Sequence, residues 1–444
     1  MTEEEKLERR KEQIKKRKKR VRNRRILFVV TETILLLVVI ACAVLLHFLG
    51  KIGKNYVVVD EDVIYKPSQG TAPRTTEEVA NIDPTTREPQ TIITTDPNDP
   101  SESDVVVVIP SSEVVEAPTT THPEFNPGTE YTTFCIIGVD GRSGYDLSSS
   151  KGLNSDVMMV ATINNDTGEI RLASIYRDTL LKGYTSGKYD KANQPFSSNG
   201  YIDEINTLAY NLDIAFDYFV VIDWTAAIEI IQLLGGVDVE MKAAYKTIKN
   251  PDPDTAAEQP RVPYFNGLIN EIVESTGIGT VPIPDEAFQD GLIYHLDGVQ
   301  AVAYMRMRRT DSDFNRTQRQ RDVMGQALEL AKKADLGTLV SMLDIVGNNM
   351  LFNISQDSII GLMANATKYS MAGSYGYPSK LYDGSGYEGK MKWNVIPVNV
   401  IQNVTALHLQ LYPDLPYYPS DVIYQIDEEL RLIGQFDENW ELHL

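Results

Sequence analysis

Residues 155–178 read SDVMMVATINNDTGEIRLASIYRD, and this stretch decides the fold. Two apolar runs, at 156–163 and 169–175, flank the residues NNDTG at 164–168. Short apolar runs bounded by Asn, Asp and Gly are typical of strands buried in a sheet, and the NNDTG segment favours a tight turn. The stretch therefore predicts an antiparallel hairpin inside a larger sheet.

The register of this hairpin brings three charged residues together. Pairing Ile163 with Ile170 across the turn places Asp156 opposite Arg177. The preceding apolar run (FCIIGVD) ends at Asp140, so an up-and-down arrangement puts all three charges at one edge of the sheet. Two carboxylates and a guanidinium there fit a site for magnesium and phosphate, while a turn cap and a structural ion pair are the simpler alternatives.

Helices alternate with strands after the hairpin, which predicts an α/β fold: a three-layer α-β-α domain with a mixed central sheet. Residues 249–290 are rich in Pro, Gly and acids and indicate a surface insertion. The expected elements are helices at 202–212, 225–234, 297–303 and 314–333 and strands at 218–222 and 237–241.

The first 49 residues predict a membrane anchor. Residues 1–25 carry 13 Lys and Arg against 5 acids, although the whole chain of 444 residues has a net charge of −20. Residues 26–49 are 24 mostly apolar residues with one acid, Glu32, and are long enough to cross a bilayer as a helix. The positive-inside rule places the basic tail in the cytoplasm and the rest of the chain outside. A signal peptide or lipoprotein box cleaved near Cys42 is the alternative, but the apolar run continues past it.

The remaining chain divides by composition. Residues 50–128 are rich in Pro, Thr and acids and predict a disordered extracellular stalk, which includes the valine run at 105–108. We expect the folded domain at 129–335, with residues 336–444 completing or extending it.

Six arginines lie within residues 306–321 of an otherwise acidic outer region. Guanidinium groups bind phosphate oxygens in a two-pronged way, so this cluster indicates an anionic ligand. One compact cluster in a domain of negative net charge does not fit nucleic acid. The six are Arg306, Arg308, Arg309, Arg316, Arg319 and Arg321.

Spacing assigns these arginines to faces. If residues 304–308 are extended, Arg306 and Arg308 point to one side. On the following helix, Arg316, Arg319 and Gln320 share a face, and Arg321 falls off it at a position expected to be solvated. The sequence therefore predicts two sets of side chains that point the same way: Arg306 with Arg308, and Arg316 with Arg319 and Gln320.

Other chemistries have little support. The five histidines show no zinc-ligand spacing, and the chain has no Walker loop. The second cysteine, Cys135, cannot pair with a cysteine in a membrane helix. A large outward-facing domain without a disulfide suits a bacterial cell envelope.

Six short blocks, in this order, make the chain resemble the LytR-CpsA-Psr family. The resemblance runs from about residue 131 to 333. The blocks are GVDGR at 138–142, SDVMM at 155–159, SIYRDT at 174–179, LGGVDV at 234–239, LDGVQAVAYMR at 296–306 and DFNRTQRQ at 313–320.

The resemblance implies a membrane-anchored phosphotransferase outside the cell. It would transfer a glycopolymer, such as teichoic acid or capsule, from a polyprenyl pyrophosphate carrier to peptidoglycan, with the lipid tail in an apolar pocket. A magnesium ion would lie at Asp140 and Asp156. The residues matching catalytic positions are Asp140, Asp156, Arg177, Arg306, Arg308 and Gln320, and those matching substrate-binding positions are Arg142, Asp178, Arg316 and Arg319.

The chain departs from the family pattern at two positions. Asn154 stands where the family often has Arg, so Arg142 or Arg309 would have to replace that charge, and Tyr176 replaces a frequent Pro. Two other functions remain open: a signalling or scaffolding protein that only binds pyrophosphate lipids, and a hydrolase that uses water at the same site.

Overall fold

The computed structural model describes most of the chain after residue 130 and short pieces before it. The described residues are 57–59, 63–67, 90–96, 99–108, 130–140, 147, 153–248, 262–310, 313–335, 337–339, 341–342, 345, 350–383, 394–437 and 439–440.

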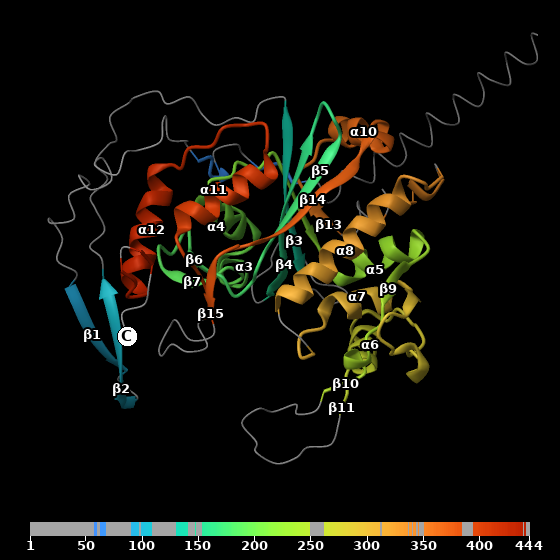
Figure 1. Ribbon diagram of the computed structural model, residues 1–444, viewed down its shortest axis with the longest axis horizontal. Helices are drawn as coiled ribbons and strands as arrows, with labels where there is room; N and C mark the ends of the chain where they lie inside the picture. The colour runs from blue at the N-terminus through green and yellow to red at the C-terminus, as the bar shows by residue number, and fades with distance from the viewer. Residues whose placement is uncertain are drawn as a thin grey trace, which may run out of the picture.

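A six-stranded mixed sheet forms the centre of the molecule (Figure 1). Its strand order is β13-β8-β3-β4-β5-β14, with β3 parallel to β8, β5 parallel to β14 and the other neighbours antiparallel. This confirms the predicted α/β class with a mixed central sheet. The strands are β3 (Tyr131–Val139), β4 (Ser155–Asn164), β5 (Glu169–Ile175), β8 (Tyr218–Ile222), β13 (Met350–Phe352) and β14 (Ser370–Tyr377).

The β4–β5 hairpin has the predicted register, with Ile163 paired to Ile170. The Asn164 side chain accepts hydrogen bonds from the backbone N–H groups of Asp166 and Thr167 at 3.0 and 2.9 Å. Gly168 closes the turn with φ +75°, and a Cβ there would lie 2.6 Å from a neighbouring carbonyl oxygen. Turn chemistry in the sequence therefore fixes which residues of the two strands face each other.

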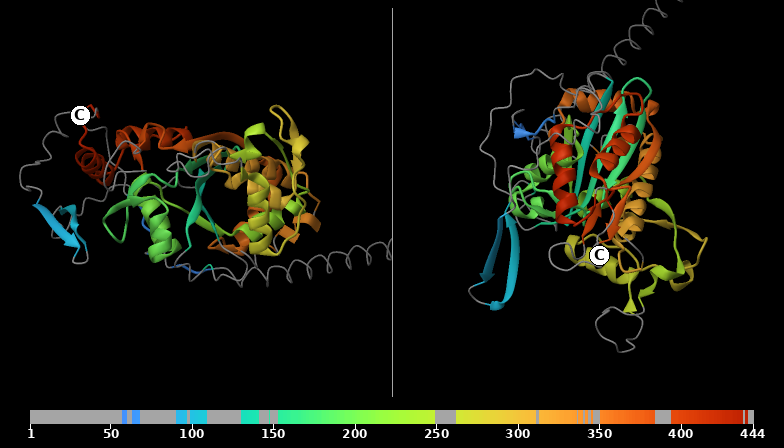
Figure 2. Two further views of the ribbon diagram at one scale, coloured as in Figure 1. Left: turned by 90° about the horizontal axis from the view of Figure 1, so that it is seen from below. Right: turned by 60° about the vertical axis from the view of Figure 1, so that its left-hand side comes forward.

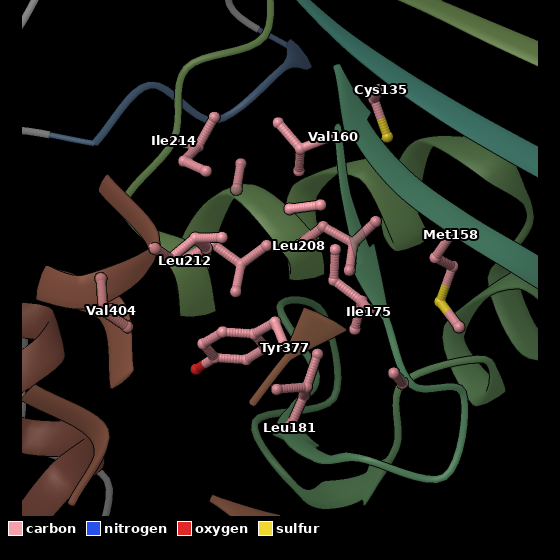
Figure 3. Close-up of a cluster of buried hydrophobic side chains, with 14 of the residues drawn as sticks. Cys135, Met158, Val160, Ile175, Leu181, Leu208, Leu212, Ile214, Tyr377 and Val404 are labelled. Carbon is pink, nitrogen blue, oxygen red and sulfur yellow. The ribbon is translucent and has the colours of Figure 1, made fainter. Parts of the chain in front are cut away.

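Helices cover both faces of the sheet. Alternate residues of β5 point to opposite faces, since Ala173 joins the largest apolar cluster and Leu172 joins another. Figure 3 shows part of the larger cluster, where Cys135, Val160 and Leu208 lie together with other apolar side chains. One face carries α3 (Gln194–Asn199), α4 (Tyr201–Leu212), α11 (Val400–Leu411) and α12 (Asp421–Ile433), and the other carries α5 (Trp224–Leu233), α7 (Gly298–Arg306), α8 (Asp313–Ala331) and α10 (Gln356–Ala364).

Most predicted helices and strands are confirmed within three residues at each end. The Asp297 side chain and Gln300 form a capping box at the start of α7. This helix continues to Arg306, so the prediction that residues 304–308 are extended is wrong for the first half of that segment. The helix extends three residues further because Tyr304 packs in an apolar cluster and the Arg319 side chain donates to the Tyr304 and Met307 carbonyls at its end.

The prediction of a surface insertion at 249–290 is wrong for its second half. There α6 (Phe265–Thr276) buries Phe265, Ile269 and Ile272 against α7. Their i, i+4, i+7 spacing is that of a helix with one apolar face, a signal obscured by the Pro, Gly and acids around it. Figure 2 shows this part of the chain, in yellow, beside the helices of the same face.

The prediction of a disordered stalk is wrong in two places. The Val57 N–H donates to the Phe352 carbonyl at 2.9 Å, and the Tyr65 N–H donates to the Asn206 side chain at 2.8 Å, so this segment packs on the domain. The valine run belongs to β2 (Asp99–Val108), which pairs with β1 (Gln90–Asp96). The partner strand was not evident because its sequence is polar and threonine-rich.

The predicted membrane helix at 26–49 lies outside the described residues. Within the ranges described, no helix has the length and apolar character needed to cross a bilayer. The shorter elements are β6 (Leu180–Lys182), β7 (Tyr189–Lys191), β9 (Val237–Glu240), β10 (Thr247–Ile248), β11 (Val262–Pro263), β12 (Ile293–Leu296), β15 (Leu381–Asp383) and β16 (Val395–Pro397), with 3-10 turns at Ala243–Tyr245, Asp285–Ala287 and Ala366–Lys368.

Candidate active site

Three strand ends meet where the hairpin predicted. Val139 at the end of β3 pairs with Ser155 at the start of β4, so Asp140, just after β3, and Asp156, the second residue of β4, lie at adjacent strand ends. Arg177 lies two residues past β5, and its Nη1 donates to Oδ1 of Asp156 at 2.5 Å. The predicted pairing of Asp156 with Arg177 is confirmed.

The electrostatic surroundings keep Asp156 ionised. Burial would raise the pKa of its carboxyl, but the guanidinium groups of Arg316, Arg177 and Arg308 together lower that pKa below its usual value. Nη1 of Arg316, a residue only 1% exposed, lies 3.9 Å from Oδ1 of Asp156. A carboxylate held this way is a weak base and is suited to binding a cation or orienting arginines.

The Asp178 carboxylate lies among three cationic side chains, and one of them, Arg177, also contacts Asp156. Its carboxylate lies 2.8 Å from Nζ of Lys191, 3.7 Å from Nε of Arg177 and 3.9 Å from Nη2 of Arg308. Arg177 therefore spans both carboxylates. Asp178 and Arg308, both expected in the site, are brought to the same edge of the sheet as Asp156.

Arg306 reaches the site from the end of α7. Its guanidinium stacks 3.6 Å above the ring of Trp224, and its Nη2 lies 3.1 Å from Oε1 of Glu271. Stacking on an aromatic ring fixes the plane of a guanidinium and leaves its edges for hydrogen bonding. Arg306 and Arg308 thus approach from a helix end and a loop, not from one side of an extended segment.

An apolar cavity of about 200 Å³ opens at this cluster. It lies between the sheet and helices α5, α7 and α8, and four charged side chains, Asp156, Asp223, Arg306 and Arg316, line it together with Gln320. The remaining lining is almost entirely apolar. It consists of Ile136, Gly138, Val139, Val157, Met159, Ile222, Trp224, Ala227, Ile230, Ile231, Val302, Met305, Val323, Met324 and Ala327.

Three residues of this site escaped prediction from the sequence. Asp223 and Trp224 follow β8, and because β8 runs parallel to β3, its end lies at the same edge as Asp140. The rule that the ends of parallel strands lie at one edge of a sheet could have predicted both residues from the sequence. Lys191 comes from the short strand β7, and no local pattern marks it.

Arg319 does not line the cavity. It is 3% exposed, its Nε donates to the Tyr304 carbonyl at 3.2 Å, and its Nη2 donates to the Met307 carbonyl at 2.6 Å. Its guanidinium contacts backbone carbonyls here, and its substrate-binding role stays a prediction. Arg319 joins α8 to the end of α7, and so positions Arg306 and Arg308.

Three other arginines have different outcomes. Arg321 is 6% exposed, so the expectation of a solvated position is wrong. It is buried because the packing of α8 covers a face that helical spacing alone leaves outside. The backbone N–H of Arg309 donates to the Tyr264 hydroxyl at 3.1 Å. Arg142 lies outside the described residues, so its substrate-binding role stays a prediction.

The acids at the strand ends fit a magnesium ion bound together with a ligand. Mg²⁺ usually takes one or two protein carboxylates and completes its shell with water and substrate phosphates. Within the described ranges, no group of three or more His, Cys, Asp or Glu side chains could hold a metal by itself. A magnesium site of the two-carboxylate type at Asp140 and Asp156 stays a prediction.

A family model covers the residues that build this site. The model described as the LytR_cpsA_psr family matches residues 109–375. The chain belongs to this family. The match includes five strands of the central sheet, all but the last two residues of the sixth strand β14, and the helices that surround the cavity.

Named relatives in the family include two teichoic acid transferases. The chain is 27% identical over 266 residues to the polyisoprenyl-teichoic acid–peptidoglycan teichoic acid transferase TagT of Bacillus subtilis, a match that covers 59% of this chain and 72% of the relative. It is 28% identical to the corresponding transferase TagU of Halalkalibacterium halodurans, covering 52% of this chain and 63% of the relative, which is less than two thirds.

A solved structure has the same fold. Protein gbs0355 from Streptococcus agalactiae matches with a TM-score of 0.51 at 24% identity, and the match covers 66% of this chain and 90% of that one. At this identity the likeness establishes the fold alone.

Proposed function

We propose that this protein is a phosphotransferase that moves a glycopolymer from a polyprenyl pyrophosphate carrier to peptidoglycan. One observation supports the proposal above the others: an apolar cavity opens directly at a cluster of arginines and carboxylates. An amphiphile with a long apolar tail and a multiply charged anionic head matches that combination. The names of the relatives point to the same reaction.

In this proposal the lipid tail enters the cavity between the sheet and helices α5, α7 and α8. The pyrophosphate then lies at the mouth, beside Arg306 and Arg316 of the cavity lining. Arg177 and Arg308 lie beside the pyrophosphate in this proposal, Arg177 paired with Asp156 and Arg308 with Asp178. Charge-assisted hydrogen bonds from guanidinium groups become stronger as negative charge grows on the leaving phosphate.

The reaction transfers a glycosyl phosphate. A hydroxyl oxygen of the acceptor forms a new bond to the phosphorus that carries the glycan. The phosphoanhydride bond breaks, and polyprenyl phosphate leaves with that bond's electron pair. The hydroxyl proton passes to a base other than Asp156, because the arginines hold the pKa of Asp156 low. The pyrophosphate bond supplies the free energy, so no nucleotide is needed.

Asp140 and Asp156 would hold a magnesium ion. The ion would add positive charge at the pyrophosphate, a contribution of several kcal/mol to stabilising the transition state in enzymes of this type. We also propose that residues 26–49 anchor the chain in the cell membrane, with the domain outside. The glycopolymer could be a teichoic acid, a capsule polysaccharide or another glycan.

A blocked cavity tests the proposal. Ala327→Phe places a ring in the cavity from α8, whereas Ala331→Phe adds the same ring one turn further along α8, outside the lining. We expect Ala327→Phe to lose binding of a polyprenyl pyrophosphate in detergent micelles and to lose transfer, and Ala331→Phe to keep both. Equal binding by both variants would contradict the assignment of the cavity to the lipid.

A further inference from the structure

A second cavity, of about 650 Å³, lies on the other side of α8 from the lipid cavity. Its lining comes from three parts of the fold: α8, the β9–β12 ladder with the turn before it, and the edge strand β14. We call it the α8 groove. Its polar lining residues are Asp238, His295, Arg321, Asp322, Gln326, Glu329 and Ser374, and Gly236 and Gly325 line it as well.

The wall of the groove is held in place by paired polar groups. Nδ1 of His295 lies 2.8 Å from Oδ1 of Asp238. Gln326 accepts from the Asp238 N–H at 2.9 Å and donates to its carbonyl at 2.8 Å. A Cβ at Gly236, where φ is +93°, would lie 2.5 Å from the Leu296 carbonyl oxygen and 2.6 Å from Nε2 of His295, so only glycine allows this close approach to the β12 backbone and to the imidazole. These hydrogen bonds set a polar wall in a defined position.

Arg321 provides the observation that points to a ligand. It lines the groove, is 6% exposed, and its Nη2 donates to the Gln318 side chain at 2.5 Å. Its Nε and Nη1 are buried and have no hydrogen-bond partner among the residues that the structure describes. Leaving donors of a buried cation unsatisfied is costly, so a ligand that brings oxygen atoms would be bound favourably.

Gly325 leaves the floor of the α8 groove without a side chain. Gly325 lies in the interior of α8, where glycine costs about 1 kcal/mol relative to alanine. A Cβ there would meet only Cε of Met371, at 4.0 Å, so no neighbouring atom requires glycine. A glycine that packing does not require, in the floor of a groove, allows close approach of a bound molecule to the helix.

The charge of the groove selects among ligands. Three acids, Asp238, Asp322 and Glu329, line it against one arginine. A polymer rich in phosphate would be repelled. Carboxylate, amide, hydroxyl and imidazole groups together bind an uncharged chain of hydroxyls and acetamides well.

The groove begins next to the reaction site. Arg321 follows Gln320, which lines the lipid cavity, and the groove continues along α8 to Leu330. The ten helical residues from Arg321 to Leu330 span roughly 13 Å, enough for a short glycan segment. We propose that the α8 groove binds the acceptor glycan of the transfer reaction. This inference rests on the proposed function, and it assigns the donor polymer to other surfaces.

A pair of glycine variants tests the groove. Gly325→Gln fills its floor, and Gly361→Gln makes the same change on α10, where a Cβ would meet nothing within 4 Å. Both changes favour the helix, so neither should unfold the protein. With the full chain in detergent, we expect Gly325→Gln to weaken binding of a soluble peptidoglycan oligomer at least tenfold, with polyprenyl pyrophosphate binding unchanged. Gly361→Gln should match the unmodified protein in both titrations.

The titrations separate this inference from the proposed function. In one outcome the unmodified protein binds the oligomer but transfers nothing, and Gly325→Gln abolishes that binding. This outcome supports the groove and contradicts the transferase. If transfer occurs and Gly325→Gln leaves both oligomer affinity and acceptor KM unchanged, the acceptor lies elsewhere and the inference is overturned. Absence of oligomer binding in the unmodified protein, measured with donor present and absent, also overturns it.

Discussion

Replacing Arg177 with lysine isolates the contribution of its planar guanidinium. The Arg177 side chain lies 2.5 Å from Asp156 through Nη1 and 3.7 Å from Asp178 through Nε, so one group spans two carboxylates. Lysine keeps the charge but has a single ammonium that can satisfy only one of them. The hydrogen bond at risk is that of Nη1 to Asp156, a charge-assisted bond of about 1.5–3 kcal/mol, because the contact with Asp178 is beyond hydrogen-bond distance.

We expect kcat/KM for transfer to fall roughly ten- to a hundredfold, since about 1.4 kcal/mol corresponds to a factor of ten. The pKa of Asp156 should also rise, because the arginines are what lowers it against burial. The acid limb of the pH–rate profile should therefore move to higher pH.

The matched control is Arg171→Lys. Arg171 lies on β5 itself, at the end far from the site, in an ion pair of 2.8 Å with Glu169. Transfer by Arg171→Lys should equal that of the unmodified protein. If both lysine variants were equally active, or equally inactive with normal folding, the spanning role of Arg177 would be refuted.

Three further predictions concern the acids and the buried groups. Asp140→Ala and Asp156→Asn should each lose most transfer and show altered magnesium dependence with an intact circular dichroism spectrum; retained activity with unchanged magnesium titration in both would reject the metal site. Arg319→Lys should lower the free energy of unfolding in urea by about 2–3 kcal/mol, since it loses hydrogen bonds to buried carbonyls; normal stability with lost transfer would instead indicate contact with substrate. Burial raises the pKa of the Glu204 carboxyl to about 8 from 4.5, so the folded state keeps a proton that the unfolded state loses, and stability falls as pH rises between those values. Glu204→Gln should therefore raise Tm more at about pH 8.5 than at about pH 5. A change in Tm that is independent of pH would contradict this.

The sequence predicted features that depend on neighbours along the chain. The NNDTG turn fixed the register of β4 and β5, and with it the contact between Asp156 and Arg177. Strand ends likewise placed Asp140 at the same edge. Local chemistry was sufficient because the turn and both strands lie within 24 residues.

Features that depend on packing between distant segments were not predictable. The edge strand β14 reads SMAGSYGY, which has little strand pattern, and β5 recruits it by parallel pairing. Arg319 and Arg321 are buried by the contact of α8 with other elements, which helical spacing cannot reveal. Helix α7 ends three residues later than predicted, and this changes the direction in which Arg306 points. Lys191 contacts Asp178 from a separate strand pair without any motif.

The most direct test follows the lipid product. The full chain is incubated with a polyprenyl pyrophosphate-linked glycan, with or without a peptidoglycan oligomer, and polyprenyl phosphate and phosphate-linked glycan on the oligomer are both quantified by mass spectrometry. The proposed transfer predicts equal amounts of the two products, formed only when the oligomer is present. Release of polyprenyl phosphate at the same rate without the oligomer would identify a hydrolase, and binding of the donor without any product would identify a binding protein; either result would contradict the transferase.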